Sequence, residues 1–325
     1  MNRWSTLPLG VDIGSTRVRI ACAELDRTGR ICLRAVVARN VPARIVASDG
    51  SISEPHALAA LIAEARAELG VRECRAVAAL GAPAATLRVV QLPRMTRIER
   101  IRAARFEAER FTAGELDDHA PIVRIYPAEK RDCWAIGAVR ADMLATCAQT
   151  LRLARLRPVA IDHTANALRR ALTSGDAIAD VGSERSTLYA FSERGPLAWT
   201  LAHGGAEVTR SIAGELAIDY ATAERRKRIL GVCGAGTDAR ARLVEGLAAL
   251  VEAARLRLPI QLVSLTGNGA RLTGLKERLE TACGAAIDIP AAASLDTRAY
   301  PIDVVRAAAP DWSLAVGLAL WSTAA

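Results

Sequence analysis

Two stretches decide the fold of this 325-residue chain: Val11-Asp12-Ile13-Gly14-Ser15-Thr16-Arg17 and Ala179-Asp180-Val181-Gly182-Ser183-Glu184-Arg185. Each one ends an apolar strand with an aspartate, an apolar residue and Gly-Ser, and the residues that follow favour a strand running back. In both places a third strand and then a helix are expected next. A sequence that begins again in this way predicts two similar α/β domains, each built on the same hairpin.

The tight turn in each stretch has the residues of a phosphate-binding loop. Its glycine lets backbone N–H groups approach an anion with no side chain in the way, and its serine adds a hydroxyl donor. Asp12 and Asp180, at the ends of buried strands, can hold a hydrated Mg²⁺ ion, which keeps most of its water ligands in nucleotide sites. One such turn is typical of any β-hairpin. Two copies facing one another would hold a polyphosphate from both sides.

A third glycine turn follows the strand expected at residues 260–265 and precedes the helix expected near 273–281. Its sequence is Ser264-Leu265-Thr266-Gly267-Asn268-Gly269-Ala270. Glycines at this place would let the backbone approach a nucleoside closely. A single glycine-rich loop is a weak signal, so its weight here comes from the two phosphate-type turns that precede it.

These three turns, in this order, resemble the phosphate-1, phosphate-2 and adenosine motifs of the superfamily of actin, DnaK-type proteins and sugar kinases. The resemblance implies a two-domain actin-like α/β ATPase fold, a duplicated ribonuclease H-like unit whose halves enclose the nucleotide. Within the superfamily, the chain is similar over nearly its whole length to the PilM family, relatives of FtsA that act in type IV pilus assembly.

Several further stretches carry the similarity to PilM. They are Val90-Gln91-Leu92-Pro93-Arg94-Met95, Arg105-Phe106-Glu107-Ala108-Glu109-Arg110-Phe111, Leu156-Arg157-Pro158-Val159-Ala160-Ile161-Asp162, Gly204-Gly205, Ala223-Glu224 with Lys227, and Val316-Gly317-Leu318-Ala319-Leu320. The first is similar to the family's strand ending in Leu-Pro-x-Met, and the second resembles its Phe-Glu-Ala-Glu helix. From the residues alone, that second stretch is typical of a surface helix with one core anchor.

The resemblance also implies the domain organisation. The first domain would span residues 1–162 and carry an inserted subdomain of the 1C type at about 83–158. The second would span 163–325, with a small inserted subdomain at about 206–258. A final helix over 311–323, capped by Asp311, would pack back toward the first domain.

Carried over position by position, the resemblance implies a site for ATP and Mg²⁺. The residues implied are Asp12, Gly14, Ser15, Thr16 and Arg19 from the first turn and strand, Asp180, Gly182 and Ser183 from the second, with Gly204, Gly205, Glu224, Lys227, Gly267, Asn268 and Gly269. Arg19 stands where the family often has a phosphate-contacting lysine, and Mg²⁺ would be held through water by Asp12 and Asp180. Glu224 and Lys227 would reach the ribose or base, although an ordinary solvated pair one helical turn apart fits their spacing equally well.

The stretch Ile161-Asp162-His163-Thr164-Ala165-Asn166 departs from the hydrolysing members of the superfamily. Thr164 occupies the position where PilM relatives frequently carry a glutamate, and a threonine hydroxyl cannot accept a proton as a carboxylate does. Asp162 is the one candidate that could replace it, and His163 is interpreted as a capping or packing residue. The sequence therefore predicts ATP binding with at most weak ATPase activity.

By resemblance, the function is that of a cytoplasmic nucleotide-binding scaffold in the inner-membrane platform that assembles type IV pili. Its partners would be other platform components and the short cytoplasmic tail of a PilN-like membrane protein, received in a groove next to the inserted subdomain. The chain would then be peripheral to the inner membrane through its partners, and self-association is left open.

Three alternatives share the fold. A small-molecule kinase would need a catalytic aspartate, commonly in a Gly-Asn-Asp-like run, and the sequence shows none. An FtsA-like polymer-forming protein would continue into a linker and an amphipathic helix, and an L-type secretion protein into a transmembrane span. The sequence printed here ends at Ala325, directly after its last apolar helix, which favours PilM over both.

Composition supports a cytoplasmic protein without direct nucleic-acid binding. The chain has 43 basic and 35 acidic residues, and the arginines are scattered along its whole length, whereas nucleic-acid binders concentrate charge on one face or tail. Its seven cysteines form no CxxC pair, which indicates a reducing compartment. The apolar stretch Trp312 to Trp321 is about half of what spans a bilayer, so no membrane insertion of its own is expected.

Overall fold

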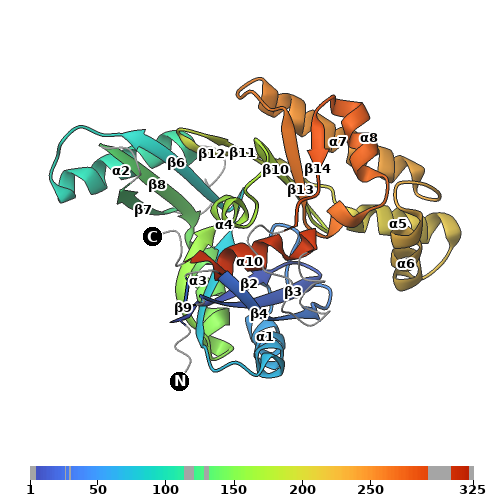
Figure 1. The fold of residues 1–325 in the computed structure, drawn as a ribbon, viewed down its shortest axis with the longest axis horizontal. Helices are drawn as coiled ribbons and strands as arrows, with labels where there is room; N and C mark the ends of the chain where they lie inside the picture. The colour runs from blue at the N-terminus through green and yellow to red at the C-terminus, as the bar shows by residue number, and fades with distance from the viewer. Residues whose placement is uncertain are drawn as a thin grey trace.

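The computed structural model describes residues 5–25, 27–28, 31–112, 121–127, 132–291 and 309–321. Their strands form three sheets, of six, five and three strands. Figure 1 shows the three as separate lobes, with the first sheet below, the second at the upper right and the smallest at the left. The α/β class predicted from the sequence is therefore confirmed.

The first sheet contains the first of the two repeated hairpins. Its strands are β1 (Ser5–Thr6), β2 (Leu9–Ile13), β3 (Arg17–Leu25), β4 (Ile31–Asn40), β5 (Arg75–Leu80) and β9 (Arg157–His163). β2 pairs with β3 antiparallel and with β5 parallel, and β9 continues the parallel side. The helices around it are α1 (Pro55–Leu69), α3 (Ala141–Leu153), α4 (Thr164–Ala171) and α10 (Ser313–Ala319).

The second sheet repeats this pattern. Its strands are β10 (Ala177–Val181), β11 (Ser186–Ser192), β12 (Gly195–Leu201), β13 (Leu262–Thr266) and β14 (Ala286–Asp288). β10 pairs with β11 antiparallel and with β13 parallel, as β2 does with β3 and β5. The helices of this half are α5 (Gly205–Leu216), α6 (Tyr220–Leu230), α7 (Thr237–Arg255) and α8 (Leu275–Cys283), with the short 3-10 helices η1 (Asn268–Arg271) and η3 (Pro310–Trp312).

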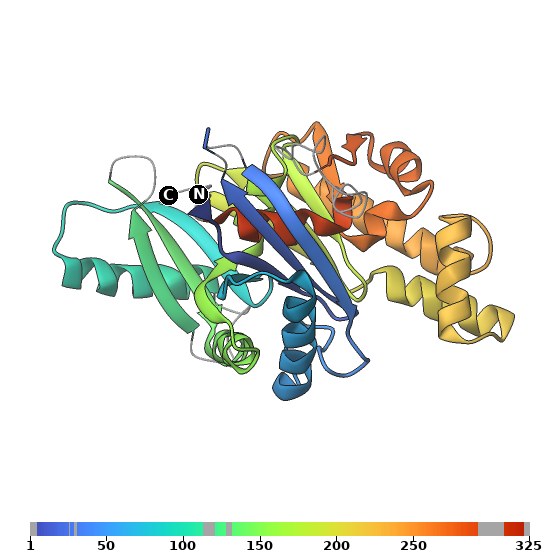
Figure 2. The same ribbon diagram turned by 60° about the horizontal axis from the view of Figure 1, so that its bottom comes forward.

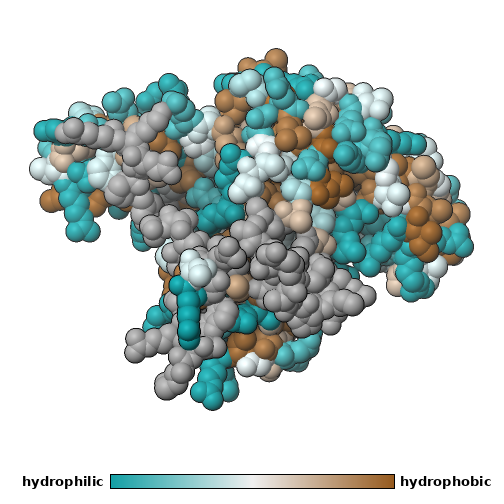
Figure 3. All heavy atoms as spheres, in the orientation of Figure 1, coloured by the Kyte–Doolittle hydropathy of each residue, from teal (hydrophilic) through white to brown (hydrophobic). Residues whose placement is uncertain are grey.

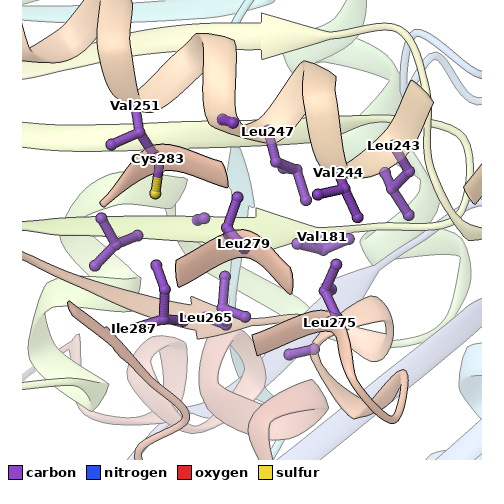
Figure 4. Packing of buried hydrophobic residues seen from close by; sticks show 14 of the residues in the cluster. Val181, Leu243, Val244, Leu247, Val251, Leu265, Leu275, Leu279, Cys283 and Ile287 are labelled. Atoms are coloured by element: carbon purple, nitrogen blue, oxygen red, sulfur yellow. The ribbon is translucent and has the colours of Figure 1, made fainter. Parts of the chain in front are cut away.

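The two larger sheets alternate with three layers of helices, because successive side chains of a strand point to opposite faces of its sheet. In β3, Ile20 and Cys22 face the core under α1 and α3, whereas Ala21 and Ala23 face α4 and α10. That second cluster also contains Ile178 of β10, so α4 and α10 lie between the two sheets. Figures 1 and 2 show α10 in red crossing the middle of the molecule. The other face of β10 packs against α7 and α8, as Figure 4 shows for Val181, Leu247 and Leu279.

Glycines allow α10 to lie this close to its neighbours. A Cβ on Gly10 of β2 would stand 1.9 Å from the carbonyl oxygen of Ala315, and a Cβ on Gly317 would stand 1.9 Å from that of Ala167 in α4. Only a residue without a side chain fits at either place. Because α10 follows η3 directly, this packing also fixes the position of residues Pro310–Trp312 between the two sheets.

The third sheet interrupts the first half between β5 and β9. It has the order β6 (Ala85–Gln91), β8 (Cys133–Arg140), β7 (Pro121–Pro127), and helix α2 (Arg97–Thr112) covers one face through Ala104 and Ala108. Its edge meets the second half, because Val89 N–H donates to the Arg194 carbonyl at 2.8 Å. The Arg88 guanidinium also donates to the carbonyl of Pro196, at 2.7 Å.

Some expected elements differ from the structure. β1 and β14 are too short to show in the sequence pattern. The final helix, expected over 311–323, is α10 at Ser313–Ala319 after a 3-10 turn, and residues 322–325 lie outside the described part. No helix in the described ranges has the length and apolar character to cross a membrane. On the face in Figure 3, hydrophilic side chains occur over both the β6–β8 lobe and the lobe with α7.

Candidate functional site

The two repeated turns have the same backbone geometry. Gly14 N–H donates to the Arg17 carbonyl at 2.9 Å, and Gly182 N–H donates to the Arg185 carbonyl at 3.0 Å. A Cβ on either glycine would approach that carbonyl oxygen to 3.0 Å or less, so both turns need the missing side chain. The aspartate before each turn lies opposite a residue seven positions on, Arg19 in the first copy and Thr187 in the second.

The two turns line one cavity. It has a volume of about 240 Å³, and its walls include Asp12, Gly14, Ser15, Thr16 and Arg19 from the first half and Asp180, Gly182, Ser183, Gly267 and Asn268 from the second. A second cavity of about 290 Å³ adjoins it, lined by Thr16, Gly182, Ser183, Gly205, Glu224, Lys227, Asn268 and Gly269. Arg185 further joins the halves by donating to the Asp49 carbonyl at 3.3 Å. Every residue assigned to the cofactor site except Gly204 therefore lines one of two adjoining cavities.

Charged groups on the floor of the first cavity form a chain. Arg19 lies between two carboxylates, 3.5 Å from Asp12 and 3.2 Å from Asp311, and only 7% of it is exposed. Asp311 is 5% exposed and also accepts a bond from Arg271 at 3.3 Å. The Asp311 carboxylate therefore links an arginine of the first half to an arginine of the second.

The two aspartates of the repeat are destabilised as anions. Burial raises the pKa of Asp180 from an ordinary 3.8 to about 7, and the charge of Asp12 raises it further while Arg19 opposes both. Burial also raises the pKa of Asp12, against the attraction of Arg19. Asp12 and Asp180 are half-buried, and of the two only Asp12 forms an ion pair with Arg19, so their combined charge leaves room for a cation. The described residues hold no group of three side chains that could ligate a metal directly, and the two aspartates fit Mg²⁺ held through its own water.

The third turn packs directly onto the second. Gly267 has φ of 80°, and a Cβ there would stand 2.5 Å from Oδ1 of Asp180. A Cβ on Gly269 would stand 2.3 Å from Cγ1 of Val181. Both glycines are therefore needed for the loop to reach the end of β10. Asn268, between them, lines both cavities.

Gly204 and Gly205 hold the second turn against the start of α5. The N–H groups of Gly205 and Ala206 donate to the carbonyls of Gly182 and Ser183, at 3.0 and 2.8 Å. A Cβ on Gly204 would stand 2.3 Å from the Ser183 carbonyl oxygen. These amides are therefore occupied within the protein. The role of Gly204 here is to position the turn, while Gly205 also borders the second cavity.

Glu224 and Lys227 form an ion pair in which the lysine is buried and the glutamate half-buried. The Lys227 ammonium lies 2.6 Å from the Glu224 carboxylate and donates to Thr209 Oγ1 and the Gly205 carbonyl, each at 2.9 Å. Only 7% of Lys227 is exposed. Burial lowers the pKa of Lys227, and its bond to Glu224 opposes that shift. Lys227 is therefore withdrawn from solvent, Glu224 is half-buried, and both side chains line the second cavity.

The residues weighed for hydrolysis take different places. Asp162 forms an ion pair with Arg170 and accepts the His163 N–H at 2.7 Å, and it does not line either described cavity. Thr164 does line the first cavity. His163 caps α4 by accepting the Ala165 N–H at 3.2 Å, and burial lowers its pKa to about 4, so it is neutral. The capping role inferred for His163 is confirmed.

Several residues of the cavity were not identified from the sequence. Asp311 appeared only as a helix cap, because nothing in its neighbourhood indicates that it meets Arg19, which lies 292 positions away. Thr187 could have been found by extending the repeat, since it occupies the place of Arg19 in the second copy. Tyr189, two residues on, lines the same cavity and could have been found in the same way.

The repeated hairpins, facing each other across a cavity with helices on both sides of each sheet, define the actin-like ATPase fold. Solved structures agree. The structure of EutJ, an ethanolamine utilization protein from Carboxydothermus hydrogenoformans, aligns with 98% of this chain. The alignment takes in 89% of the EutJ chain, at 16% identity and a TM-score of 0.60. Diol dehydratase-reactivating factor in its nucleotide-free form covers 99% and 100%, at 10% identity and a TM-score of 0.56. The predicted two-domain actin-like fold is confirmed.

Within that class, the chain is similar to PilM over almost its whole length. A structure of the PilM–PilN type IV pilus biogenesis complex covers 97% of this chain and 98% of its own, at 26% identity and a TM-score of 0.81. The predicted resemblance to the PilM family is therefore confirmed. No protein-family model and no curated protein sequence matches the chain.

Proposed function

We propose that this chain is a nucleotide-binding scaffold of the platform that assembles type IV pili at the inner membrane. It binds Mg-ATP between its two halves and the cytoplasmic tail of a PilN-like membrane protein. The observation that carries the proposal is the meeting of residues 12–16 and 180–183 in one cavity. The halves are assigned to residues 1–162 and 163–325.

The phosphates occupy the first cavity and the nucleoside the second. Backbone N–H groups and the hydroxyls of Ser15 and Ser183 contact the phosphates, while Asp12 and Asp180 orient the water shell of Mg²⁺. Mg²⁺ neutralises part of the charge of the phosphates when it is bound. Glu224, fixed by Lys227, offers a carboxylate to the ribose or base, and the loop 267–269 packs against the adenosine.

Hydrolysis is at most weak in this proposal. A general base has to lie within hydrogen-bond reach of the attacking water. Thr164 is at the cavity but carries no carboxylate, and Asp162 is held by Arg170 outside it. The nucleotide therefore serves as a structural ligand that joins the halves.

The partner assignment depends on the similarity to PilM in a complex with PilN. A cytoplasmic protein that reaches the membrane through such a partner needs no spanning helix, and none occurs in the described ranges. The same role includes binding to other components of the platform and self-association of this chain.

Calorimetric titration with Mg-ATP tests the site. Asp12→Asn together with Asp180→Asn should abolish measurable binding, because both anions that orient the Mg²⁺ shell are lost. Asp238→Asn, an exposed aspartate in the first turn of α7, is the matched control and should bind as the wild type does.

Unchanged affinity in the double variant would remove the site assignment. Phosphate release from Mg-ATP should stay near background in the same preparation. A turnover of about 10 per second, typical of enzymes, would instead favour a kinase or an active ATPase.

A further inference from the structure

Arg17 lies where the two cavities meet. It is the first residue of β3, directly after the first turn, and it lines both cavities. Its neighbour Thr16 does the same. Side chains two positions apart in a strand point to the same face, so Arg17 and Arg19 both extend from β3 toward the site.

Arg19, at the position of the family's phosphate-contacting lysine, is already engaged. It bridges Asp12 and Asp311, and its guanidinium lies 5.9 Å from the centre of the Trp312 ring. Moving it onto a phosphate would leave the 5% exposed Asp311 with Arg271 as its one remaining partner in the described chain. Removing one partner from a buried ion pair is strongly unfavourable.

The side chain of Arg17 has no such partner. Within the described ranges it makes no ion pair and no hydrogen bond, whereas Arg271 pairs with Asp311 and Arg228 pairs with Glu224. Burial lowers the pKa of Arg17, the like charges of Arg19, Arg228 and Arg271 lower it further, and the carboxylate of Asp311 opposes these shifts. A half-buried guanidinium among three other cations is stabilised by an anion.

We propose that Arg17, and not Arg19, is the side-chain cation that binds the phosphate groups of the ligand at the junction of the two cavities. This inference rests on the proposed function. It separates two tasks of β3: Arg19 joins Asp12 to Asp311 within the protein, and Arg17 offers its free guanidinium N–H groups to two phosphate oxygens at once.

The test is titration of Arg17→Gln with Mg-ATP and with Mg-tripolyphosphate, which has the phosphates but no nucleoside. Both affinities should fall at least tenfold. Arg17→Lys should recover part of the loss, because an ammonium supplies the charge but not the paired N–H donors of a guanidinium. Arg102→Gln, an exposed arginine on α2, is the control and should bind both as the wild type does. Thermal unfolding of ligand-free Arg17→Gln should occur no lower than that of the wild type, because the substitution removes repulsion.

The outcomes separate this inference from the proposed function. If the wild type binds Mg-ATP and Arg17→Gln binds it equally well, the role of Arg17 is wrong and the nucleotide site stands. If the wild type binds only tripolyphosphate and the variant loses it, the phosphate role of Arg17 stands and the ATP assignment fails. If the wild type binds neither, both are wrong.

Discussion

The raised pKa of Asp180 makes two properties change with pH in opposite directions: the stability of the ligand-free protein and its affinity for Mg²⁺. Its pKa of about 7 lies far above its ordinary 3.8, because burial and the nearby Asp12 disfavour the anion. In the unfolded chain the carboxyl group ionises near 4. Between these values the folded protein holds a proton that the unfolded chain has lost, so stability falls as pH rises through this window. Binding of Mg²⁺ requires the anion and therefore strengthens over the same window.

We expect the affinity for Mg-ATP to rise with pH toward about 7, with a slope of up to about tenfold per pH unit for each of the two carboxyl groups that has to ionise. The free energy of unfolding of the ligand-free protein should fall between about pH 4 and 7. Calorimetry and denaturant titration across this range measure the two quantities.

Asp180→Asn provides the control, since an amide does not titrate. It should flatten the fall in stability between pH 4 and 7, leaving the part that comes from Asp12. Affinity that is independent of pH in the wild type would show that no carboxyl group in this cavity has to ionise.

At the scale of elements, helix α10 was expected from the sequence, but its role in positioning the site was not. It is short, and it is held by close backbone contacts at Gly10 and Gly317 as well as by the buried side chains of Val316 and Leu318. Because η3 precedes it, any shift of α10 moves Asp311 relative to Arg19. The geometry of the cavity therefore depends on the fit of a helix behind it.

Gly10→Ala and Gly317→Ala should each destabilise the protein by about 1–3 kcal/mol or more, because the added methyl group meets a backbone carbonyl at 1.9 Å. Gly214→Ala is the matched control, since a Cβ there would have no atom within 4 Å. In the last turn of α5 it should stabilise by up to about 1 kcal/mol. Urea unfolding gives all three values, and a destabilised Gly214→Ala with unaffected Gly10→Ala would contradict the packing described.

At the scale of the whole molecule, the two halves touch at more than the nucleotide site. The inserted sheet meets β12 and its turn through Val89 and Arg88, and the Arg185 side chain meets residue 49. A ligand that draws the halves together therefore also acts on the inserted subdomain, where the resemblance to PilM places the partner groove. Nucleotide and partner binding are expected to be coupled for this reason.

The measurement uses a synthetic peptide with the cytoplasmic tail of a PilN-like membrane protein, the partner proposed above. Saturating Mg-ATP should change its affinity by a factor between about 5 and 150, the usual range for two coupled sites. Fluorescence polarisation gives the affinity, with a scrambled peptide as control. Asp12→Asn with Asp180→Asn should show one affinity with and without nucleotide, and equal affinities in the wild type would exclude coupling.

The sequence by itself determined the duplicated fold and a set of site residues of which all but Gly204 line the two cavities. The pattern Asp-x-Gly-Ser after an apolar strand is local, since it depends on strand burial, on the missing side chain at Gly14 and Gly182, and on the turn that each glycine permits. Such features repeat wherever the local chemistry repeats. The sequence therefore predicted the hairpins, the third turn and the site they share.

Only the tertiary structure decided how the charges are paired. Whether Arg19 or Arg17 is free for a ligand depends on Asp311, which is brought to β3 by the packing of α10 from the far end of the chain. The burial of Lys227 and the removal of Asp162 from the cavity likewise depend on partners in other elements or on the opposite face of a strand. Electrostatic energies vary with distance and burial in three dimensions, and neither quantity is written in the local order of residues.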